Sequence, residues 1–366
     1  MTGGPVGVGL IGAGTISDTY LENLTGFPDV EVRMVSDLDV ARAAEQAQKY
    51  GVPASGTVAD LLADPRIEIV VNLTIPVAHV EVGLAALDAG KHVWAEKPLG
   101  MDRPSARKLL DRAREKGLRV ASAPDTVLGA GLQTMRRLVD DGRIGVPQSG
   151  LALFQSPGPE SWHPAPEFLF QPGAGPLLDI GPYYLTALVL MMGPVARVTA
   201  AGGRGREVRV IGSGPRAGTE FEVTVPTSVS ALLEFRRGGS AQVLFSFDSA
   251  LRRTTLELTG TQGSLVLPDP NRFDGTGQLH LLDADEPVGV PAEGHTASRG
   301  TGVLELARAI RAGRPERASG ELAYHVLDMM LAMEESVTGG HTVEVESTVD
   351  TPPPLEAEWD PHRRTL

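Results

Sequence analysis

Short apolar runs alternate with helical stretches throughout the first third of this 366-residue chain. Each apolar run is continuous, as is typical of strands buried on both faces of a parallel sheet. A helix between successive strands supplies the crossover that a parallel pair needs. The pattern therefore predicts a doubly wound α/β domain of the Rossmann type over residues 1–123. The expected strands are 6–11, 30–35, 67–73 and 92–95, and the expected helices are 17–24, 41–50, 78–89 and 104–117.

The pattern changes after residue 123. Several later apolar stretches alternate with a period of two and are separated by glycine-rich turns, which indicates strands with one buried face. We therefore predict an α+β domain over residues 124–348 with an open, mainly antiparallel sheet, followed by an extended, proline-rich tail over 349–366. The expected strands are 150–154, 195–201, 228–235, 241–247, 255–258 and 264–267, with helices at 129–141, 180–192, 302–312 and 322–338.

The composition excludes several classes of partner and site. A net charge of −13 is opposite in sign to that of a protein that binds a phosphate backbone, so nucleic acid is not an expected partner. The chain has no cysteine, which excludes disulfides and thiolate metal ligands, and we expect no metal site. No apolar run approaches the roughly 18 residues of a membrane span. We expect a cytoplasmic protein that does not bind membranes.

A glycine-rich turn follows the first expected strand and opens the first expected helix. In this turn Gly12 permits a tight bend, and Gly14 lets the backbone approach a pyrophosphate. Ser17 replaces the third glycine of the usual fingerprint and is small enough for close packing of helix on strand. The start of the helix would face the phosphates. Gly12, Gly14, Thr15 and Ile16 are therefore candidate cofactor-binding residues.

An acidic residue lies about 20 residues beyond this turn, where a dinucleotide site places one. Asp37 ends the second expected strand, and its carboxylate would bond the ribose hydroxyls of NAD and repel the 2′-phosphate of NADP. Asp39 adds a second negative charge, and Arg42 is the first arginine to follow. The pattern favours NAD over NADP. The alternative for Asp37 is a helix cap.

Lys97 is one of only five lysines, and it lies in Glu96-Lys97-Pro98 directly after the fourth expected strand. A lysine ammonium has a pKa that its surroundings can shift, whereas a guanidinium stays charged. A nucleotide loop and a lysine at the end of a strand indicate that a cofactor and a reacting group are brought together.

Together these segments resemble the Gfo/Idh/MocA oxidoreductase family over about 340 residues. The resemblance implies an NAD(P)-binding N-terminal domain and an open C-terminal sheet through which members form homodimers or homotetramers. It also implies oxidation or reduction of a hydroxyl on a sugar, cyclitol or related polyol. The stretches that carry it are 8–17, Thr74 with His79, 89–99 and 178–183.

The resemblance also assigns roles to single residues. Lys97 matches the catalytic lysine that contacts the nicotinamide ribose and the substrate, and Glu96 beside it is a further candidate cofactor-binding residue. Asp179 matches the aspartate that orients the substrate. Thr74 and His79 match the loop beside the cofactor, although the family's Thr-Pro pair reads Thr74-Ile75-Pro76 here, which predicts an altered loop shape. The alternatives are a helix N-cap for Asp179 and a structural role for His79.

Tyr183 stands where many family members have a histidine as general acid and base. Glucose–fructose oxidoreductase-like members also carry tyrosine there, so the resemblance implies that a tyrosine at this position is compatible with catalysis. A phenol with a pKa near 10 is a poor base, but a neighbouring ammonium such as that of Lys97 would lower this pKa. Asp179 lies one helical turn earlier and projects to the same side. The alternative is that Tyr183 is a packed core aromatic.

Trp162 and His163 lie in a proline-rich loop before Asp179 and are further candidates for binding substrate. Aromatic faces commonly stack on sugars, and His163 is an alternative proton carrier. A loop tryptophan that only anchors the domain is the other interpretation of Trp162.

Three functions follow from these residues. The first is an NAD-dependent dehydrogenase or reductase acting on a sugar, cyclitol or polyol. The second is an NAD-dependent glycosidase on the same fold, which oxidises a sugar carbon transiently with no net redox change. The third is a non-enzymatic NAD-binding sensor, which would have no need of Lys97 and Asp179.

Overall fold

A computed structural model describes residues 3–366, which divide into two units. Unit 1 comprises the described part of Met1–Ala130 together with Glu293–Tyr324 and Pro352–Leu366, and unit 2 comprises Gly131–Ala292 and His325–Thr351. The expected domains 1–123 and 124–348 and the tail 349–366 were contiguous. The units are discontinuous, because two later segments of the chain pack on the N-terminal part.

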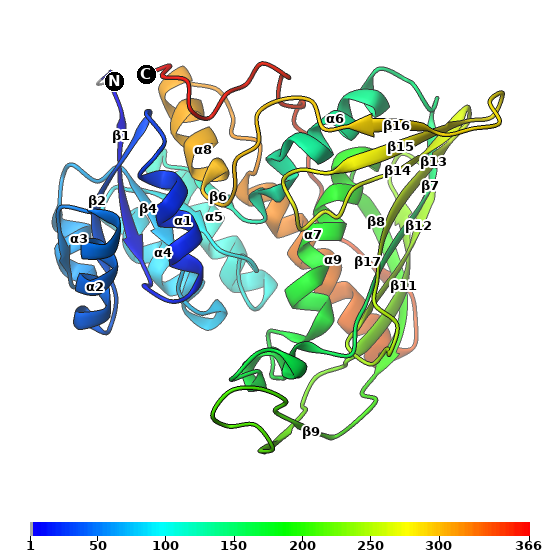
Figure 1. Cartoon of the computed structure of the whole chain (residues 1–366), viewed down its shortest axis with the longest axis horizontal. Helices are drawn as coiled ribbons and strands as arrows, with labels where there is room; N and C mark the ends of the chain where they lie inside the picture. The colour runs from blue at the N-terminus through cyan, green and yellow to red at the C-terminus, as the bar shows by residue number, and fades with distance from the viewer. Residues whose placement is uncertain (1–2) are drawn as a thin grey trace. The chain divides into compact units, whose positions relative to one another are not determined.

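Unit 1 is built on a six-stranded parallel sheet with the order β3-β2-β1-β4-β5-β6, so the predicted doubly wound α/β architecture is confirmed (Figure 1). The central strands β1, β4 and β5 are almost entirely buried, as their largely apolar sequences require. β1 lies between β2 and β4, which makes its carboxyl end the switch point of the sheet. The strands are β1 (Val6–Ile11), β2 (Val30–Ser36), β3 (Ser55–Gly56), β4 (Ile69–Asn72), β5 (His92–Ala95) and β6 (Val120–Ser122).

Helices in unit 1 fall into two packed groups, in which α1 packs against α2 and α8 and α4 packs against α5. Most begin and end within two residues of the predicted bounds, because side-chain caps and left-handed glycines mark their ends. The short α3 was not predicted, although a capping box at Thr57 and Asp60 marks its start. The helices are α1 (Ile16–Leu24), α2 (Val40–Tyr50), α3 (Val58–Ala63), α4 (His79–Asp88), α5 (Arg103–Lys116) and α8 (Thr301–Ala312), with 3₁₀ turns η1 (Pro76–Ala78) and η2 (Asp125–Leu128).

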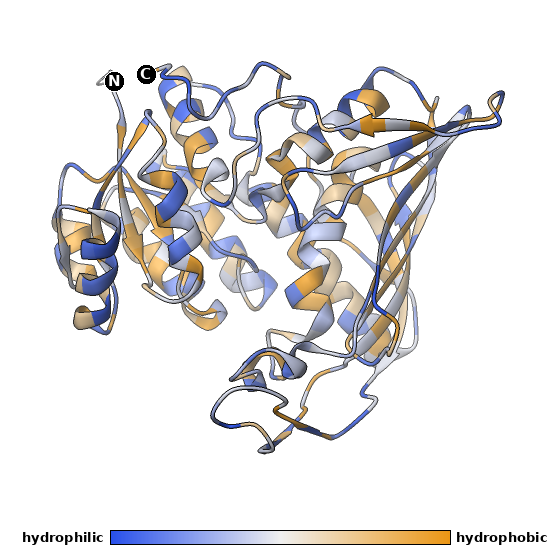
Figure 2. Ribbon diagram, in the orientation of Figure 1, coloured by the Kyte–Doolittle hydropathy of each residue, from blue (hydrophilic) through white to orange (hydrophobic). Residues whose placement is uncertain are grey.

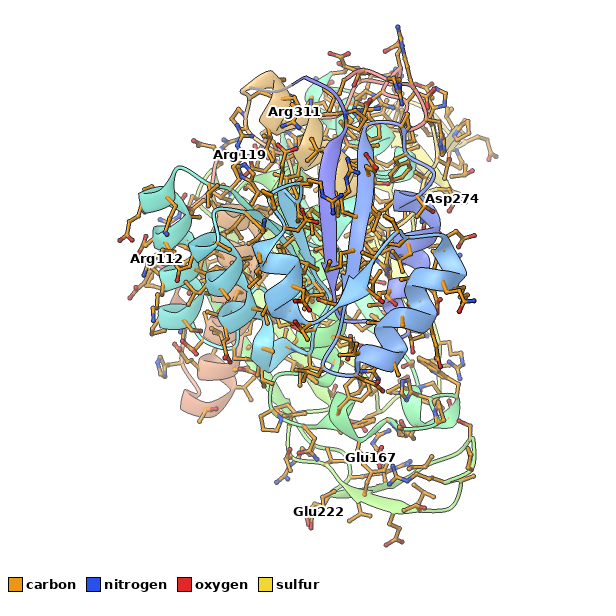
Figure 3. All side chains as sticks on the ribbon, turned by 90° about the vertical axis from the view of Figure 1, so that its left-hand side faces the viewer. Arg112, Arg119, Glu167, Glu222, Asp274 and Arg311 are labelled. Atoms are coloured by element: carbon orange, nitrogen blue, oxygen red, sulfur yellow. The ribbon has the colours of Figure 1, made fainter. Side chains whose placement is uncertain are left out.

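Ion pairs and the C-terminal segment stabilise the amino-end side of the unit 1 sheet. Arg311 pairs with Glu68 at 2.6 Å, and Arg119 pairs with Glu316 at 3.1 Å. Figure 3 shows Arg119 and Arg311 at the same end of this sheet. The final residues form no helix or strand, and Thr365 donates backbone and hydroxyl hydrogen bonds to Asp29. Ion pairs and hydrogen bonds within the protein thus occupy the amino-end side of the unit 1 sheet.

Unit 2 contains a nine-stranded sheet with the order β16-β15-β14-β13-β7-β12-β11-β8-β17, which is mainly antiparallel as predicted. One pair, β7 with β12, is parallel. Buried and exposed residues alternate along β11 and β13, and Figure 2 shows hydrophobic and hydrophilic colours alternating along these strands. The strands are β7 (Pro147–Gln155), β8 (Val195–Gly203), β11 (Ser228–Phe235), β12 (Ser240–Ser246), β13 (Arg253–Gly260), β14 (Gly263–Val266), β15 (Thr276–Leu281), β16 (Val288–Pro291) and β17 (Val343–Glu344).

The helix α7 (Gly175–Met192) packs against β7, β11 and β12 and forms the centre of unit 2. Its length and composition would suit a membrane span, so the expectation that no apolar run reaches that length is wrong. However, 89% of this stretch is buried in the structure, as in the core helix of a globular unit. The other helices are α6 (Ala130–Asp140) and α9 (Gly320–Gly339).

A small lobe of unit 2, here called the β9–β10 lobe, is formed by residues 156–174 and 204–227. It contains a separate two-stranded sheet of β9 (Val208–Val210) and β10 (Glu220–Glu222), with the turns η3 (Pro159–Ser161) and η4 (Glu167–Phe170). Figure 3 labels Glu167 and Glu222 in this lobe. Its own core includes Leu169, Phe170, Ile211, Phe221 and Val223.

Candidate active site

Five loops of unit 1 lie side by side at the carboxyl ends of the parallel strands. In the order of the sheet, these loops carry Asp37 after β2, the glycine-rich turn after β1, Thr74 after β4, Glu96-Lys97 after β5 and Asp125 after β6. Ligands of doubly wound sheets bind at this edge, near the switch point. The fold thus brings the predicted cofactor residues of unit 1 together along one edge.

The geometry of the glycine-rich turn fits a dinucleotide pyrophosphate. Gly12 has φ +104°, and a Cβ there would lie 2.6 Å from the carbonyl oxygen of Leu73, so only glycine fits. Gly14 is exposed, and an added Cβ would meet nothing within 4 Å, so its backbone is open to a ligand. The buried Ser17 donates its hydroxyl to the Gly14 carbonyl at 2.6 Å. Thr15 leads into α1 and makes no side-chain capping bond.

Asp37 is buried beside this turn and is held by three donors. The Ala13 N–H donates to Oδ2 at 2.6 Å, and the Asp39 N–H and Arg42 Nη2 donate to Oδ1 at 2.9 and 2.7 Å. Burial alone would raise the pKa of Asp37, but these hydrogen bonds, above all that from Arg42, hold it below its usual value. Asp39 is the N-cap of α2, so the helix-cap alternative for Asp37 is wrong.

Thr74 and His79 belong to a hydrogen-bonded group whose centre, Asn72, the sequence did not indicate. Asn72 Oδ1 accepts the Thr74 hydroxyl at 2.7 Å, and its amide donates to the His79 carbonyl at 2.9 Å. The ring nitrogens of the buried His79 lie 2.7 Å from the Pro98 carbonyl and 2.9 Å from the Thr74 carbonyl. Both ring nitrogens of His79 are therefore engaged within the protein, as the structural alternative expects. The displaced proline, Pro76, begins the 3₁₀ turn η1.

The Glu96 side chain forms hydrogen bonds within the protein. Its Oε1 accepts the hydroxyl of Tyr20 at 2.9 Å, and its Oε2 accepts the backbone N–H of Lys97 at 3.1 Å. Glu96 and Lys97 are both half-buried. The pair follows β5 directly, so the backbone that carries the Lys97 ammonium is tied to the sheet and to α1.

Asp125 is a buried acid that the sequence analysis missed. Its Oδ2 accepts the N–H groups of Gly300 and Gly302 at 2.8 and 3.1 Å, and Arg299 Nη1 lies 4.0 Å from Oδ1. Burial raises the pKa of Asp125 to about 6 despite these partners. Its position at the end of a strand beside the lysine loop was the available signal. However, β6 has only three residues and was not predicted.

In unit 2, the predicted substrate residues Asp179 and Tyr183 lie one turn apart on α7. Asp179 is partly exposed and Tyr183 is buried. α7 begins at Gly175 after Ala174, so Asp179 lies inside the helix and the N-cap alternative is wrong. The neighbouring Tyr184 is fully buried, and burial raises its pKa, which suits a core residue.

The other two predicted substrate residues lie in the β9–β10 lobe. Trp162 is 63% exposed, and its ring contacts His163 edge to face with centroids 5.5 Å apart. His163 makes a similar contact with Phe168, which is 57% exposed, at 5.4 Å. The His163 ring also accepts the Ala165 N–H at 3.1 Å. The three rings form one group on the surface, and its third member, Phe168, was not predicted from the sequence.

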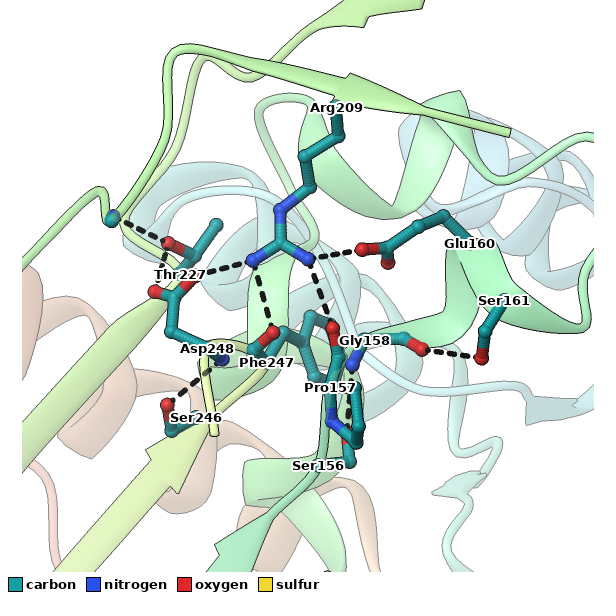
Figure 4. A network of polar contacts seen from close by, with 11 residues as sticks. Ser156, Pro157, Gly158, Glu160, Ser161, Arg209, Thr227, Ser246, Phe247 and Asp248 are labelled. Carbon is teal, nitrogen blue, oxygen red and sulfur yellow. Dashed lines mark hydrogen bonds and ion pairs between the residues drawn. The ribbon is translucent and has the colours of Figure 1, made fainter. Parts of the chain in front are cut away.

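The loop before Trp162 is held by the buried Arg209 (Figure 4). Its guanidinium bonds to the carboxylates of Glu160 and Asp248 and to the carbonyls of Pro157 at 3.1 Å and Phe247 at 2.9 Å. Only 3% of Arg209 is exposed. One side chain therefore joins β9, the loop from Pro157 to Glu160 and the end of β12.

Family comparisons agree with this arrangement. Residues 6–123 match a model described as an oxidoreductase family with an NAD-binding Rossmann fold, and residues 132–266 match the GFO/IDH/MocA C-terminal domain. The chain belongs to the Gfo/Idh/MocA oxidoreductase family. Within residues 3–366, no group of three or more histidine or acidic side chains could hold a metal ion.

Relatives of this Gfo/Idh/MocA chain extend over nearly its whole length. It is 28% identical over 346 residues to a 1,5-anhydro-D-fructose reductase from Ensifer adhaerens, covering 93% of this chain and 98% of the relative. A levoglucosan dehydrogenase solved with NADH and levoglucosan matches with TM-score 0.81 at 22% identity, covering 93% and 99% of the two chains. A 3-ketoreductase from Actinomadura kijaniata, solved with TDP-benzene and NADP, matches with TM-score 0.72 at 27% identity, covering 91% and 98%.

Proposed function

We propose that this Gfo/Idh/MocA enzyme is an NAD-dependent oxidoreductase. It transfers hydride between nicotinamide and the hydroxyl or carbonyl carbon of a sugar, cyclitol or related polyol. The observation that carries the proposal is the row of loops at the carboxyl edge of the unit 1 sheet, where the glycine-rich turn, Asp37 and Lys97 follow neighbouring strands. Two of the relatives above, the 1,5-anhydro-D-fructose reductase and the levoglucosan dehydrogenase, are named for sugar substrates, which supports this substrate class.

The choice of NAD rests on Asp37. Because its pKa is lowered, this carboxylate is ionised at neutral pH, where it would bond ribose hydroxyls and repel a 2′-phosphate. Arg42 opposes this choice, since its half-exposed guanidinium is the kind of group that binds a phosphate. The exposed Leu38 and Ile75, which follow β2 and β4, supply apolar walls for an adenine.

An Asp37→Ser variant should shift the ratio of kcat/KM values toward NADP. A ratio that stays unchanged would remove Asp37 from cofactor selection.

The protein's residues handle the proton and the substrate, while the bound nicotinamide supplies or accepts the hydride. We assign Lys97 to the nicotinamide ribose and a substrate hydroxyl, Asp179 to substrate orientation and Tyr183 to proton transfer. The assignment of Tyr183 follows the tyrosine-bearing members that the sequence resembles. Gly12, Gly14, Thr15 and Ile16 would hold the pyrophosphate.

The experiment that tests the function is turnover on a panel of sugars and polyols with NAD or NADH. Lys97→Ala should lower kcat/KM by about 10²- to 10⁴-fold, the usual contribution of a positioned acid–base group. Lys108→Ala, which removes an exposed lysine on α5, is the matched control and should keep the full rate. Full activity in Lys97→Ala would refute the mechanism. NADH accumulation in the panel distinguishes the enzyme from a glycosidase, and turnover of any kind excludes a sensor.

The proton carrier has its own test. Tyr183→Phe should flatten the alkaline limb of the pH–rate profile, because it removes the titrating phenol. An unchanged profile would transfer this role to His163 or Lys97.

Three further assignments belong to the proposal. The rings of Trp162, His163 and Phe168 provide aromatic faces on which a sugar ring can stack. The nine-stranded sheet is the surface through which the family resemblance predicts a homodimer or homotetramer. A cytoplasmic location remains a prediction from the lack of cysteine.

A further inference from the structure

A chain of hydrogen bonds runs beneath the lysine loop of unit 1. Trp94 Nε1 donates to the Tyr20 hydroxyl at 3.1 Å, and that hydroxyl donates to Glu96 Oε1 at 2.9 Å. The other oxygen of Glu96 accepts the Lys97 N–H at 3.1 Å. Each donor in this chain has an acceptor, and each oxygen of the Glu96 carboxylate accepts one of these hydrogen bonds, so the carboxylate has one preferred orientation.

The Tyr20 hydroxyl keeps its proton and therefore always donates its hydrogen bond to Glu96. Tyr20 and Trp94 are both 0% exposed. Burial raises the pKa of Tyr20 well above 10, and the nearby negative charges of Glu96 and Asp125 raise it further. The phenol therefore stays neutral at any working pH, and it cannot serve as a base.

Tyr20 connects two segments that are assigned to different parts of the cofactor, the pyrophosphate and the nicotinamide ribose. It lies on α1, whose first turn follows the glycine-rich pyrophosphate loop, whereas Glu96 and Lys97 follow β5. β4 separates β1 from β5 in the sheet, so no backbone ladder joins these segments directly. The hydrogen bond between Tyr20 and Glu96 provides that connection.

Close packing against the Trp94 ring fixes the position of the indole that donates to the Tyr20 phenol. A Cβ on Gly302 would lie 2.0 Å from the Trp94 ring, so the start of α8 lies directly against that ring. Gly302 is held in turn by its N–H bond to Asp125. On the other side of the lysine loop, His79 contacts the Pro98 carbonyl. The turn from Glu96 to Pro98 is thus held from α1 and from α4.

We propose that Tyr20 is a positioning residue that orients Lys97 toward the nicotinamide half of the dinucleotide, with Glu96 as the link between them. Glu96 then acts through the Lys97 backbone and is not itself a cofactor ligand. The inference rests on the proposed function only in requiring a nicotinamide dinucleotide. It predicts that the Tyr20 hydroxyl affects the nicotinamide end of the cofactor and leaves the adenosine end unchanged.

The test compares the affinities of the full-length protein for NADH and for ADP-ribose, which lacks the nicotinamide. Tyr20→Phe keeps the ring and removes one hydroxyl. It should weaken NADH binding by about two- to tenfold, the value of one hydrogen bond, while ADP-ribose binding changes by less than about twofold. Tyr50→Phe is the control, because the Tyr50 hydroxyl also bonds to α1, through Asp18 at 2.8 Å, away from the lysine loop. It should leave both affinities unchanged.

A purely structural role would give a different result, since a general loosening of unit 1 weakens both ligands equally. Equal losses, or no loss for either ligand, would overturn the proposal. Should Tyr20→Phe fail to fold, Glu96→Gln provides the second variant. Its side-chain amide can satisfy only one of the two donors, and it should show the same selective loss for NADH. This assay measures binding and needs no turnover, so its outcome does not depend on whether the proposed reaction is observed.

Discussion

The two units hold their candidate site residues in different ways. In unit 1, the parallel sheet already aligns the loops, and a chain of hydrogen bonds from the neutral side chains of Trp94 and Tyr20 to Glu96 only adjusts one of them. In unit 2, the β9–β10 lobe lies outside the nine-stranded sheet, and a fully charged Arg209 joins its segments to two carboxylates. Loops that a sheet places need little further support, whereas loops without a sheet depend on a strong local centre.

The largest effect should come from Arg209→Met, which keeps a long apolar stem and removes the charge. It leaves Glu160 and Asp248 without their cation, and breaking a buried pair in this way costs about 3–5 kcal/mol of stability. Arg197→Met is the matched control, because Arg197 and its partner Glu234 are largely exposed and such pairs contribute about 0–1 kcal/mol.

Hydrogen exchange of the amides in residues 204–227 measures the effect in the lobe itself, because it reports local opening. The Arg209 variant should lose far more protection there than the Arg197 variant. Similar losses in both would mean that the lobe does not depend on its charged centre, and the contrast between the units would fail.

A pH effect of intermediate size should come from Asp125 in unit 1. Its pKa rises from 3.8 to about 6 on folding, so the folded state binds its proton more tightly than the unfolded chain. The stability that this proton contributes is complete below about pH 4 and is lost as the pH rises through 6. About two pKa units correspond to about 3 kcal/mol.

Asp125→Asn should remove this contribution, since the amide oxygen can still accept the Gly300 and Gly302 N–H groups. The measurement is the difference in unfolding free energy between wild type and variant from pH 4 to pH 7. Other groups titrate in the same range: burial lowers the pKa of His325 to about 4, which destabilises the fold on acidification in both proteins. A difference that does not vary with pH would show that Asp125 titrates normally.

The predictable part of the fold is the part built on continuous apolar strands. The bounds of β1 and β5 are those expected from the sequence, because each run is mainly apolar and is followed by a residue that ends it, Gly12 after β1 and Glu96 after β5. The same rule places Asp37 and Lys97 at strand ends, so the cofactor half of the candidate site could be read from local sequence.

The lobe could not be predicted, because its pattern is inverted. In β9, Val208 and Val210 are 46% and 47% exposed, while Arg209 between them is buried. Alternation alone would bury the valines and expose the arginine. The inversion is stable only because Glu160 and Asp248 approach from distant parts of the chain, 49 and 39 residues away. No local signal carries that information.

Tyr20 was missed for a related reason. In sequence it is an apolar position of the first helix, and its acceptor Glu96 lies 76 residues away. The Glu96-Lys97-Pro98 motif drew attention to the lysine, yet its glutamate takes its orientation from a helix that the motif does not include. Side-chain partners across a sheet depend on the finished fold, even where each strand is predictable.

The smallest effect should come from Gly302→Ala in α8, which tests whether the unit 1 chain depends on close packing. By helix propensity alone, alanine should stabilise this position by up to about 1 kcal/mol. The new Cβ would instead lie 2.0 Å from the fully buried Trp94 ring, and overpacking of this kind costs about 1–3 kcal/mol. We therefore expect a net loss in unfolding free energy, together with the NADH-selective loss expected of Tyr20→Phe, because a displaced Trp94 shifts the phenol.

Gly203→Ala in β8 is the control, since a Cβ there meets nothing within 4 Å. A stabilised Gly302→Ala protein would show that Trp94 can move freely, and that the phenol is held by its hydrogen bonds alone.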